Sequence, residues 1–340
     1  MKVLSVAIPC YNSQDYIDQC VCSLLPAGED LEIILVDDGS TDRTPEIIDE
    51  YEKKYPSIIR AVHQENGGHG AAVNTGMRYA TGLYFKVIDS DDWADHDALP
   101  QVMDALRRLT RDDRQVDMFL TNFIYDKVGA RRKKIIHFRH AFPTNQIFGW
   151  DQMRHMKATQ YILMHNIIYR HQLLLDNGIA LPEHTFYVDN IFAFQPLPFV
   201  RKMYYLDVNF YHYYIGREDQ SVNEQVMIGR IDQQIFINKR MIDIMAETNF
   251  RGKDKHLKKY MYIYLDKIMA VSSALCLVSN TPENLEKKAG LWKYLRHKNL
   301  FMYLHLRRTG LGMALNIPGS FGRKASVRGY KIARKIVGFN

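Results

Sequence analysis

The chain has 340 residues and a net charge of +7, and its 46% hydrophobic and 24% charged residues exclude a disordered protein. No stretch reaches the roughly 18 to 20 unbroken apolar residues of a membrane span, and the first residues enter a predicted strand instead of a signal peptide, so we expect a cytoplasmic protein. The four cysteines lack the paired spacing of a zinc site, and we expect them to be small core residues.

Strand-like and helix-like segments alternate along the first half of the chain. We expect strands over residues 4–9, 32–36, 58–63 and 84–88, and helices over 13–25, 44–55 and 70–80. This order is typical of right-handed βαβ units, which form a mostly parallel sheet with helices on both faces. The loops at the carboxyl ends of such strands lie side by side and form the ligand site.

Polar residues follow the first two predicted strands. Pro9, Tyr11 and Asn12 form a turn whose aromatic ring and amide can flank a nucleotide base. Asp37 and Asp38 end the second strand, where a carboxylate can accept a hydrogen bond from a base imide or a ribose hydroxyl. Each set alone is more often an ordinary turn or a capped helix start.

A glycine-rich segment follows the third predicted strand. Asn66 and Gly67 begin it, and three glycines in all allow backbone N–H groups to approach a phosphate at the start of a helix. This segment, too, is weak evidence when taken alone.

An acidic cluster follows the fourth predicted strand. Asp89, Ser90, Asp91 and Asp92 come directly after an apolar run that is typical of a buried strand. Two carboxylates one residue apart at the end of a parallel strand can hold a hard divalent cation that shares its shell with phosphate oxygens. The cluster therefore indicates chemistry on a nucleotide diphosphate.

In this order and spacing the four elements resemble family 2 glycosyltransferases, the inverting nucleotide-sugar enzymes with the GT-A fold. The matching segments are residues 7–12, 34–42, 66–68 with 74–76, and 89–92. The resemblance is strong over residues 1–125, partial to about 225 and absent beyond. It implies a GT-A catalytic domain over 1–225, which binds the nucleotide-sugar through 1–125 and the acceptor through 126–225.

The resemblance also implies roles for individual residues. Pro9, Tyr11 and either Asp37 or Asp38 would hold the base, and Asp89 would approach the ribose or the sugar. Asp91, with Asp89, would ligate Mn²⁺ or Mg²⁺ bridging the diphosphate. The other residues expected at the nucleotide are Asn12, Asn66, Gly67, Asn74 and Ser90.

The group that neutralises the phosphates is left open. Many relatives carry an arginine before the residue equivalent to Asn74, whereas this chain has Val73. The resemblance places a mobile loop after an aromatic strand near residue 215, from which Arg217 would meet the diphosphate on closure. Lys86 and His212 are the alternatives.

Asp189 is the expected general base. An acceptor hydroxyl must lose its proton as it attacks the sugar, which requires a carboxylate within hydrogen-bond reach. Relatives carry a Glu-Asp pair about 100 residues past the metal cluster, and here Val188 replaces the first acid of that pair. The apolar surroundings would raise the pKa of Asp189 toward a useful range. The alternative is a helix-capping aspartate without a role in the reaction.

The last third of the chain, residues 226–340, has the apolar spacing of amphipathic helices. No Asp or Glu occurs after Glu286, while thirteen Lys and Arg do. Residues 287–340 are therefore expected to form a basic amphipathic tail that attracts anionic lipid headgroups at the inner face of the cell membrane. The alternative is a helix packed on the body with its basic face in solvent. Nucleic acid is disfavoured because no stacking platform accompanies the charges.

Together these features predict a metal-dependent transferase that moves a hexose or N-acetylhexosamine from a UDP-sugar to a saccharide or lipid-linked glycan. A sugar nucleotidyltransferase is an alternative, but it would begin with a glycine-rich, basic phosphate loop, which the turn at residues 9–12 is not. A catalytically silent GT-A scaffold at the membrane is the non-enzyme alternative.

Overall fold

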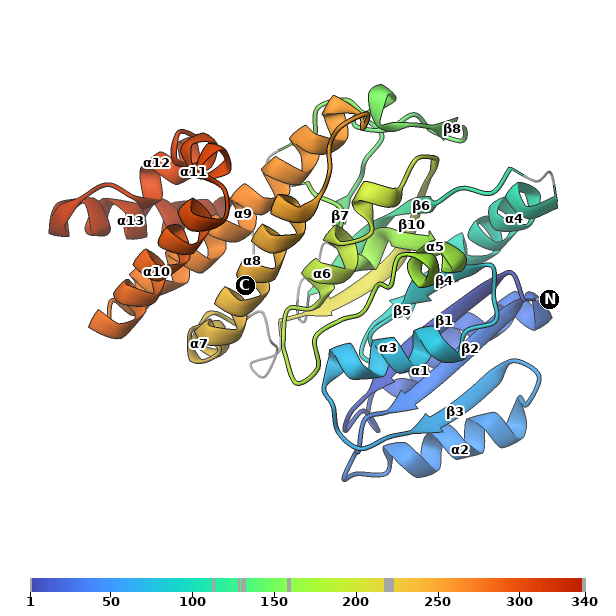
Figure 1. Ribbon diagram of the computed structural model, residues 1–340. Coiled ribbons are helices and arrows are strands. Elements are labelled where there is room, and N and C mark those ends of the chain that lie inside the picture. Colours follow the sequence, from blue (N-terminus) through green and yellow to red (C-terminus); the bar gives the residue numbers. More distant parts are fainter. Residues whose placement is uncertain are drawn as a thin grey trace. The chain divides into compact units, whose positions relative to one another are not determined.

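The computed structural model describes residues 2–111, 114–127, 129, 133–157, 160–216 and 223–337, with side chains up to residue 332. The chain forms two compact units, Met1–Ile215 and Gly216–Asn340. The first unit holds the sheet and the second is helical (Figure 1). The domain boundary expected at residue 225 falls inside the second unit.

One mixed sheet forms the centre of the first unit. Its described strands follow the order β3-β2-β1-β4-β9-β6-β10-β5, with β7 beside β6 and β8 beside β10. The strands are β1 (Leu4–Cys10), β2 (Leu31–Asp37), β3 (Ile59–His63), β4 (Tyr84–Val87), β5 (Trp93–Ala94), β6 (Met118–Lys127), β7 (Lys134–Ile136), β8 (Ile147–Phe148), β9 (Ile167–Arg170) and β10 (Met203–Ile215). The ladders among β1 to β4 and between β6 and β10 are parallel, and the shorter ones are antiparallel. The predicted α/β fold is confirmed.

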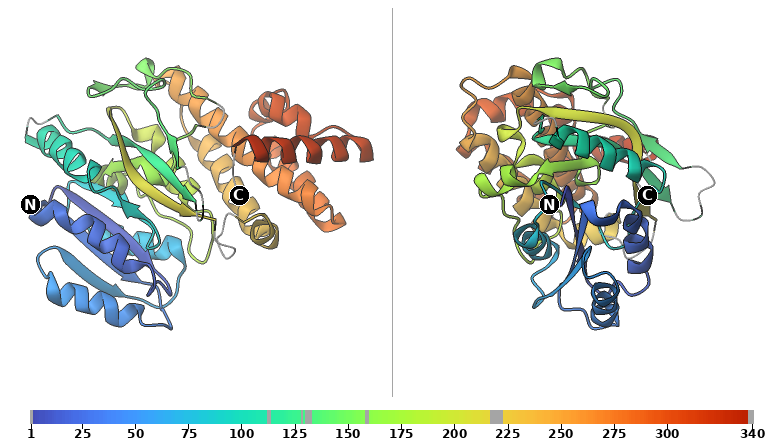
Figure 2. Two further views of the ribbon diagram at one scale, coloured as in Figure 1. Left: turned by 180° about the vertical axis from the view of Figure 1, so that it is seen from behind. Right: turned by 90° about the vertical axis from the view of Figure 1, so that its right-hand side faces the viewer.

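Helices cover both faces of this sheet. They are α1 (Ile17–Leu24), α2 (Thr44–Lys54), α3 (His69–Tyr79), α4 (Ala98–Arg111), α5 (His171–Asp176) and α6 (Asp189–Phe194). The crossovers from β1 to β3 run in one direction and the crossover to β4 runs back, so right-handed connections put α3 on the face opposite α1 and α2 (Figure 2). The same reversal between β1 and β4 creates the switch point at which ligands bind in such sheets.

The first helix begins later than the sequence indicates. Helix α1 starts at Ile17, because the carbonyl of Ser13 accepts the N–H groups of Tyr16 and Ile17 in a turn, at 2.9 and 3.0 Å. The N–H of Ser13 donates to Thr44 Oγ1 at 2.7 Å. This turn holds the chain after β1 against the start of α2.

Strands β1 and β2 are buried along their whole length, as expected for central parallel strands. Their one polar pair, Ser5 and Glu32, is opposite in register and joined by a 2.5 Å hydrogen bond from Ser5 Oγ. The same hydroxyl accepts the N–H of Gly82 at 2.8 Å. The buried polar groups are thus satisfied, and they tie the turn before β4 to the sheet.

The second unit is built around one long helix. Its helices are α7 (Glu224–Gly229), α8 (Ile231–Glu247), α9 (Lys255–Ser279), α10 (Pro282–Lys298), α11 (Leu300–Arg307), α12 (Gly310–Leu315) and α13 (Gly319–Val337). Helix α9 is long and apolar enough to cross a membrane, with a mean hydropathy of 1.5 in its most apolar window. However, 61% of that window is buried, and α9 packs against α8, α10, α12 and α13. These contacts are typical of a core helix.

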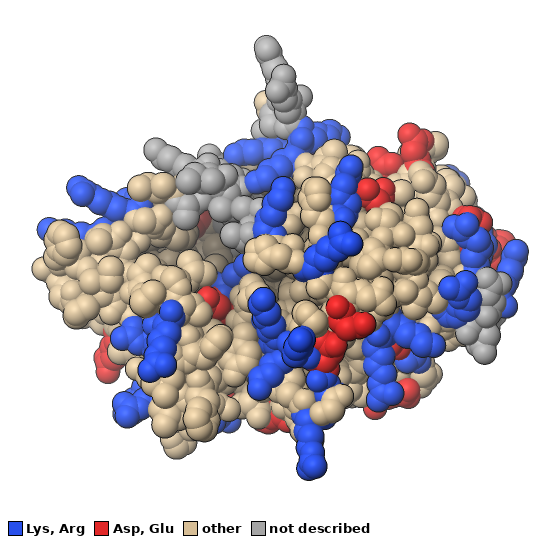
Figure 3. All heavy atoms as spheres, turned by 90° about the horizontal axis from the view of Figure 1, so that it is seen from above, with Lys and Arg blue, Asp and Glu red and all other residues tan. Residues whose placement is uncertain are grey.

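Residues 287–337 are folded onto α9 and are not a single free helix. Helix α10 buries Leu291, Trp292 and Leu295, and α13 packs Val327 and Tyr330 against the core of the unit. The tail is therefore packed on its unit, with Arg323, Lys324 and Arg328 exposed on α13. Binding of this basic face to a membrane stays a prediction. On the face drawn in Figure 3, Lys and Arg side chains are scattered with fewer Asp and Glu among them.

Close packing of α3 on β1 depends on Gly76. A Cβ atom at this position would lie 2.4 Å from Ala7 Cβ in the middle of the buried strand. Gly290, in α10, offers a matched contrast, because a Cβ atom there would meet nothing within 4 Å. Both glycines lie inside helices.

We therefore expect Gly76→Ala to lower the free energy of unfolding of the first unit by about 1–3 kcal/mol through overpacking. Gly290→Ala should instead be neutral or raise stability by up to about 1 kcal/mol, because alanine favours an exposed helix. Thermal and denaturant melts of the two variants would measure this, and equal stabilities would contradict the packing described here.

Candidate functional site

The loops after β1, β2 and β4 are joined to one another by hydrogen bonds. The Asn12 N–H donates to Ser40 Oγ at 3.0 Å, and Asn12 Oδ1 accepts the Thr41 N–H at 2.8 Å. The hydroxyls of Ser13 and Ser90 lie 2.7 Å apart. The structure thus brings three of the four predicted polar sets together at the carboxyl edge of the sheet, and the fourth, the glycine segment, is joined to them through Asp38.

The predicted base-binding residues differ in accessibility. Pro9 is buried inside β1, whereas the ring of Tyr11 is 54% exposed just beyond the strand. Asn12 is exposed and has a φ of 50°, a left-handed conformation that asparagine tolerates better than most residues. Tyr11 is therefore the aromatic ring free to meet a planar ligand.

Asp37 and Asp38 are both buried, but they bind different partners. Asp37 Oδ1 accepts the Ser40 N–H at 3.0 Å, and its Oδ2 lies 3.2 Å from His63 Nδ1. Asp38 accepts the N–H groups of Gly67 and Gly68 at 2.8 Å each, one on each oxygen. The amides of Gly67 and Gly68 are thus bound to a carboxylate of the protein. Contact of these residues with the nucleotide remains a prediction.

The glycine segment, residues 66–70, packs against residues 181–185, which precede Asp189, the predicted general base. Gly68 has a φ of 82°, and a Cβ there would lie 3.2 Å from the backbone of His184. At Gly70 a Cβ would lie 2.2 Å from the carbonyl oxygen of Pro182. The His184 N–H donates to the Gly67 carbonyl at 2.5 Å. Here the glycines permit close approach of two protein segments.

Asn74 strengthens the same junction. Its Nδ2 donates to the Leu181 carbonyl at 2.9 Å, and its Oδ1 accepts the Leu181 N–H at 2.8 Å. Asn66 donates to the Asp38 carbonyl at 2.8 Å. Both amides therefore hold the protein's own backbone, and their predicted contact with the nucleotide remains untested.

The acidic cluster has two anchored members. Asp89 Oδ1 lies 2.8 Å from His69 Nε2, and the Asp89 side chain is 25% exposed. Asp92 is buried, accepts the Tyr211 hydroxyl and also accepts the Tyr214 N–H at 2.8 Å. Asp91 lies between them in the sequence and is partly exposed. The cluster is thus fixed from β10 and α3 while part of it faces outward.

The surroundings shift the pKa values of Asp89 and Asp92 in opposite directions. Burial raises the pKa of Asp89, but the hydrogen bond and charge of His69 outweigh it, so the pKa is lowered. Burial and the charges of Asp91 and Asp89 raise the pKa of Asp92 well above its ordinary value. Crowded carboxylates of this kind are stabilised by a bound cation.

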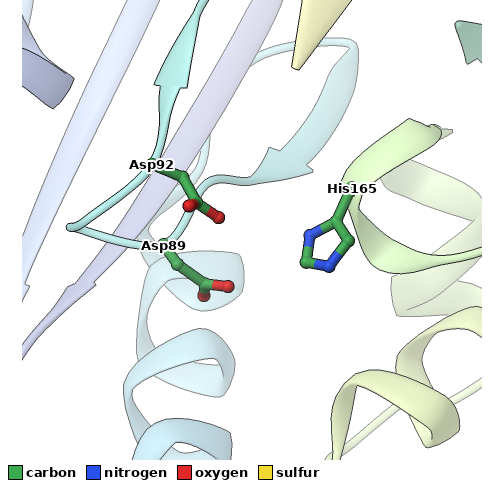
Figure 4. Close-up of side chains that lie close together, drawn as sticks. All are labelled: Asp89, Asp92 and His165. Atoms are coloured by element: carbon green, nitrogen blue, oxygen red, sulfur yellow. The ribbon is translucent and has the colours of Figure 1, made fainter. Parts of the chain in front are cut away.

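A donor set for a metal ion is present. Asp89, Asp92 and His165 each offer one ligand atom, and these atoms lie within 4.8 Å of one another (Figure 4). Among the described residues, the buried Nδ1 of His165 has no hydrogen-bond partner. Burial also lowers the pKa of His165 to about 4, so the ring is neutral at pH 7. Carboxylates with a neutral imidazole fit a divalent transition ion such as Mn²⁺.

His165 was not predicted from the sequence. It lies in the turn before β9, far from the acidic motif along the chain, and no local pattern marks it. Asp92, in contrast, already accepts two hydrogen bonds, which leaves Asp89 and the partly exposed Asp91 as the more accessible carboxylates. The donor set therefore overlaps the predicted pair at Asp89.

Two of the three candidates for phosphate neutralisation have protein partners. Lys86 is buried, donates to the carbonyl oxygens of His165 and Ile167 at 2.8 and 3.3 Å, and has its pKa lowered to about 7 by burial. His212 lies 3.1 Å from Asp126 Oδ2 and 3.2 Å from Asp95 Oδ2. Arg217 lies outside the described residues.

Asp189 begins helix α6 and is partly exposed. Burial raises its pKa to about 6, the charge of His69 opposes this shift and that of Asp89 adds to it. Asp189 thus interacts electrostatically with His69 and Asp89, although about 100 residues separate it from the acidic cluster in the chain. Tyr187, two residues earlier, has a φ of 66°, so the turn that presents Asp189 adopts an uncommon conformation.

Known proteins share both sequence and fold with this chain. The sequence model described as glycosyl transferase family 2 matches residues 5–171. The "Uncharacterized glycosyltransferase EpsJ" of Bacillus subtilis is 27% identical over 85% of this chain and 82% of its own. The "Putative glycosyltransferase EpsH" of the same organism is 26% identical over 81% of this chain and 76% of its own.

Solved structures agree on the fold. S. aureus TarS 1-349 in complex with UDP-GlcNAc superposes with a TM-score of 0.68 at 19% identity, covering 98% of this chain and 91% of TarS. The mannosyltransferase PcManGT of Pyrobaculum calidifontis, in complex with GDP-Man and Mn²⁺, has a TM-score of 0.51 at 17% identity over 98% of this chain and 86% of its own. With its sheet, its acidic cluster and a family match over residues 5–171, this chain belongs to glycosyl transferase family 2.

Proposed function

We propose that the protein is an inverting, metal-dependent glycosyltransferase. It moves a sugar from a UDP-sugar, either a hexose or an N-acetylhexosamine, to a hydroxyl of a saccharide or lipid-linked glycan. The observation that carries this proposal is the acidic cluster at the end of β4, where Asp89 Oδ1 lies 2.8 Å from His69 Nε2 and a ligand atom of Asp89 lies within 4.8 Å of one from His165. The charges of His69 and Asp89 also act on Asp189. The UDP-GlcNAc complex of TarS and the Mn²⁺ complex of PcManGT support the donor and metal classes.

The leaving group sets the first chemical demand. Breaking the bond between the anomeric carbon and the diphosphate oxygen leaves additional negative charge on the nucleoside diphosphate. Asp89 and Asp91 would hold a Mn²⁺ or Mg²⁺ ion, with His165 as a nearby nitrogen donor. When bound, the ion supplies electrostatic stabilisation of that charge.

The acceptor sets the second demand. Asp189 would take the proton of the acceptor hydroxyl as its oxygen attacks the anomeric carbon, and the bond to the diphosphate would break on the opposite side. Direct displacement of this kind inverts the anomeric configuration. Asp189 is partly exposed and has a raised pKa of about 6. Both properties support a role as the general base over a role as a helix cap.

His69 has a positioning role in this scheme. It holds Asp89 through a 2.8 Å contact and interacts electrostatically with Asp189. A positive His69 ring would keep Asp89 ionised.

Membrane placement is part of the proposal. The exposed basic face of α13, which includes Arg323, Lys324 and Arg328, lies on a stretch without acidic residues. Phe321, on the same helix, is 83% exposed. Basic and aromatic side chains together support peripheral binding to an anionic bilayer at its cytoplasmic face, where a lipid-linked acceptor would be met.

The chemistry is tested with two substitutions and one control. Asp91→Asn and Asp189→Asn should each lower Mn²⁺-dependent UDP release from a panel of UDP-sugars by about 100- to 10,000-fold. Asp176→Asn, at the exposed end of α5, should leave the rate unchanged, because asparagine can still accept from Gln172. Release that persists in both site variants would remove the mechanism, and absent nucleotide binding in the native protein would favour the scaffold alternative.

The pKa of Asp189 sets a pH dependence. The carboxylate form acts as the base, so kcat/KM should be constant above about pH 7 and fall about tenfold per pH unit below about pH 6. The initial rates would be measured with the metal held saturating at each pH. A profile that stays flat well below pH 6 would argue against Asp189 as the base.

Membrane binding is tested by substitution, because truncation at residue 287 would remove the buried Leu291, Trp292 and Leu295. Arg323→Gln, Lys324→Gln and Arg328→Gln together should weaken co-sedimentation with anionic vesicles by about 100-fold, since each surface charge contributes about 1 kcal/mol. Unchanged binding of this triple variant would retire the role of α13.

A further inference from the structure

A pocket of about 530 Å³ lies in the helical unit, between α9 and α11. Helix α9 supplies Lys255, Lys258, Lys259 and Ile263, and α11 supplies Phe301 and His305. The contributing positions of α9 repeat every three to four residues, so they share one face of the helix. None of these residues belongs to the proposed catalytic site.

The pocket walls are held together by two contacts between its helices. The rings of Tyr262 and His305 meet edge to face with centroids 4.7 Å apart. Thr309, the residue before α12, donates from its hydroxyl to Asp266 Oδ1 at 3.0 Å. The pocket is therefore part of the fold of the unit.

The rim of the pocket is strongly basic. Lys255, Lys258 and Lys259 are all exposed, and within the described ranges no carboxylate lies within ion-pair distance of their ammonium groups. Lys258 Nζ instead lies 5.5 Å above the ring of Phe250. Asp266, the acidic residue of the lining, is engaged by Thr309, and burial raises its pKa. The charge of the rim is complementary to an anion.

Exposed apolar side chains lie beside these lysines. Phe301 is 84% exposed, Leu300 50% and Ile263 38%. Water-facing aromatic and aliphatic groups next to cations have the composition of a surface that enters the boundary between lipid headgroups and acyl chains. A soluble anion would use the lysines and leave the apolar groups exposed.

We propose that this pocket binds the phosphate headgroup of an anionic membrane lipid. The lysines contact the phosphate, while Phe301 and Ile263 contact the upper acyl chain. The volume suits one phosphoglycerol headgroup, since small-ligand sites span about 300 to 1,000 Å³. The inference rests on the proposed membrane association and is independent of Asp91 and Asp189.

The test uses the full chain and vesicles of phosphatidylcholine with or without phosphatidylglycerol, in the absence of donor sugar. Combined Lys255→Gln, Lys258→Gln and Lys259→Gln should weaken binding to anionic vesicles by about 100-fold, because each lysine near such a surface contributes about fivefold. The matched control is Lys53→Gln, Lys54→Gln and Arg111→Gln, which removes the same charge from exposed positions of the catalytic unit. It should change binding by less than about threefold.

A second variant separates lipid from free anion. Phe301→Ser leaves the charge intact and should still weaken vesicle binding by about 5- to 10-fold, because an inserted aromatic ring is lost. Thermal melts in inorganic phosphate provide the other arm. Phosphate that stabilises the native chain but not the lysine variant, with vesicle binding unaffected by Phe301→Ser, would identify a soluble-anion site and overturn the proposal.

The remaining outcomes are also decisive. Equal loss of binding in the pocket variant and the control would show attraction to net charge alone, which contradicts a specific site. If the α13 variant loses vesicle binding while the pocket variant binds fully, the pocket proposal is wrong and the α13 proposal stands. UDP release with a soluble acceptor, measured beside these assays, reports the catalytic proposal separately.

Discussion

The structure depends on how three carboxylates are accommodated within four residues at the end of β4. Negative charges close together at the end of a buried strand are unfavourable unless each carboxylate is stabilised by its own partners. Asp92 is buried and satisfied by Tyr211 and Tyr214, and its pKa is raised. Asp89 is kept ionised by His69. The cluster thereby combines a fixed inner member with partly exposed outer members, an arrangement suited to holding a cation against a phosphate.

A second constraint links this cluster to Asp189, the predicted general base. The glycine segment before α3 allows residues 181–185 to approach at backbone distance, and Asn74 binds the Leu181 backbone with both groups of its amide. Asp38 holds the other side of the same segment through Gly67 and Gly68. One packed layer therefore connects the end of β2 to the turn that presents Asp189. Changes in this layer are expected to move the base relative to the acidic cluster.

The helical unit combines an ordinary core with an unusual surface. Helix α9 lies in the core and contributes 13 buried residues, and its first turns leave lysines and Ile263 exposed beside Phe301. A core helix normally hides its apolar residues, and burying this face would require a partner. An anionic bilayer meets both properties, because it takes up apolar groups and attracts cations.

The sequence determined the alternation of strands and helices, the place of each polar set at a strand end and the family resemblance, because these depend on local periodicity and on residues adjacent in the chain. It also indicated Asp89 and Asp189 as candidate site residues, and their roles stay predictions. Only the tertiary structure decided which groups these residues meet. His165 reaches the cluster from a turn without a motif, and Lys86 is buried with its ammonium group bound to the carbonyl oxygens of His165 and Ile167. The N–H groups of Gly67 and Gly68 bind Asp38, although their sequence is equally compatible with binding a phosphate. Such partners come from segments far apart along the chain, and their pairing is set by the packing of the sheet, which no local pattern encodes.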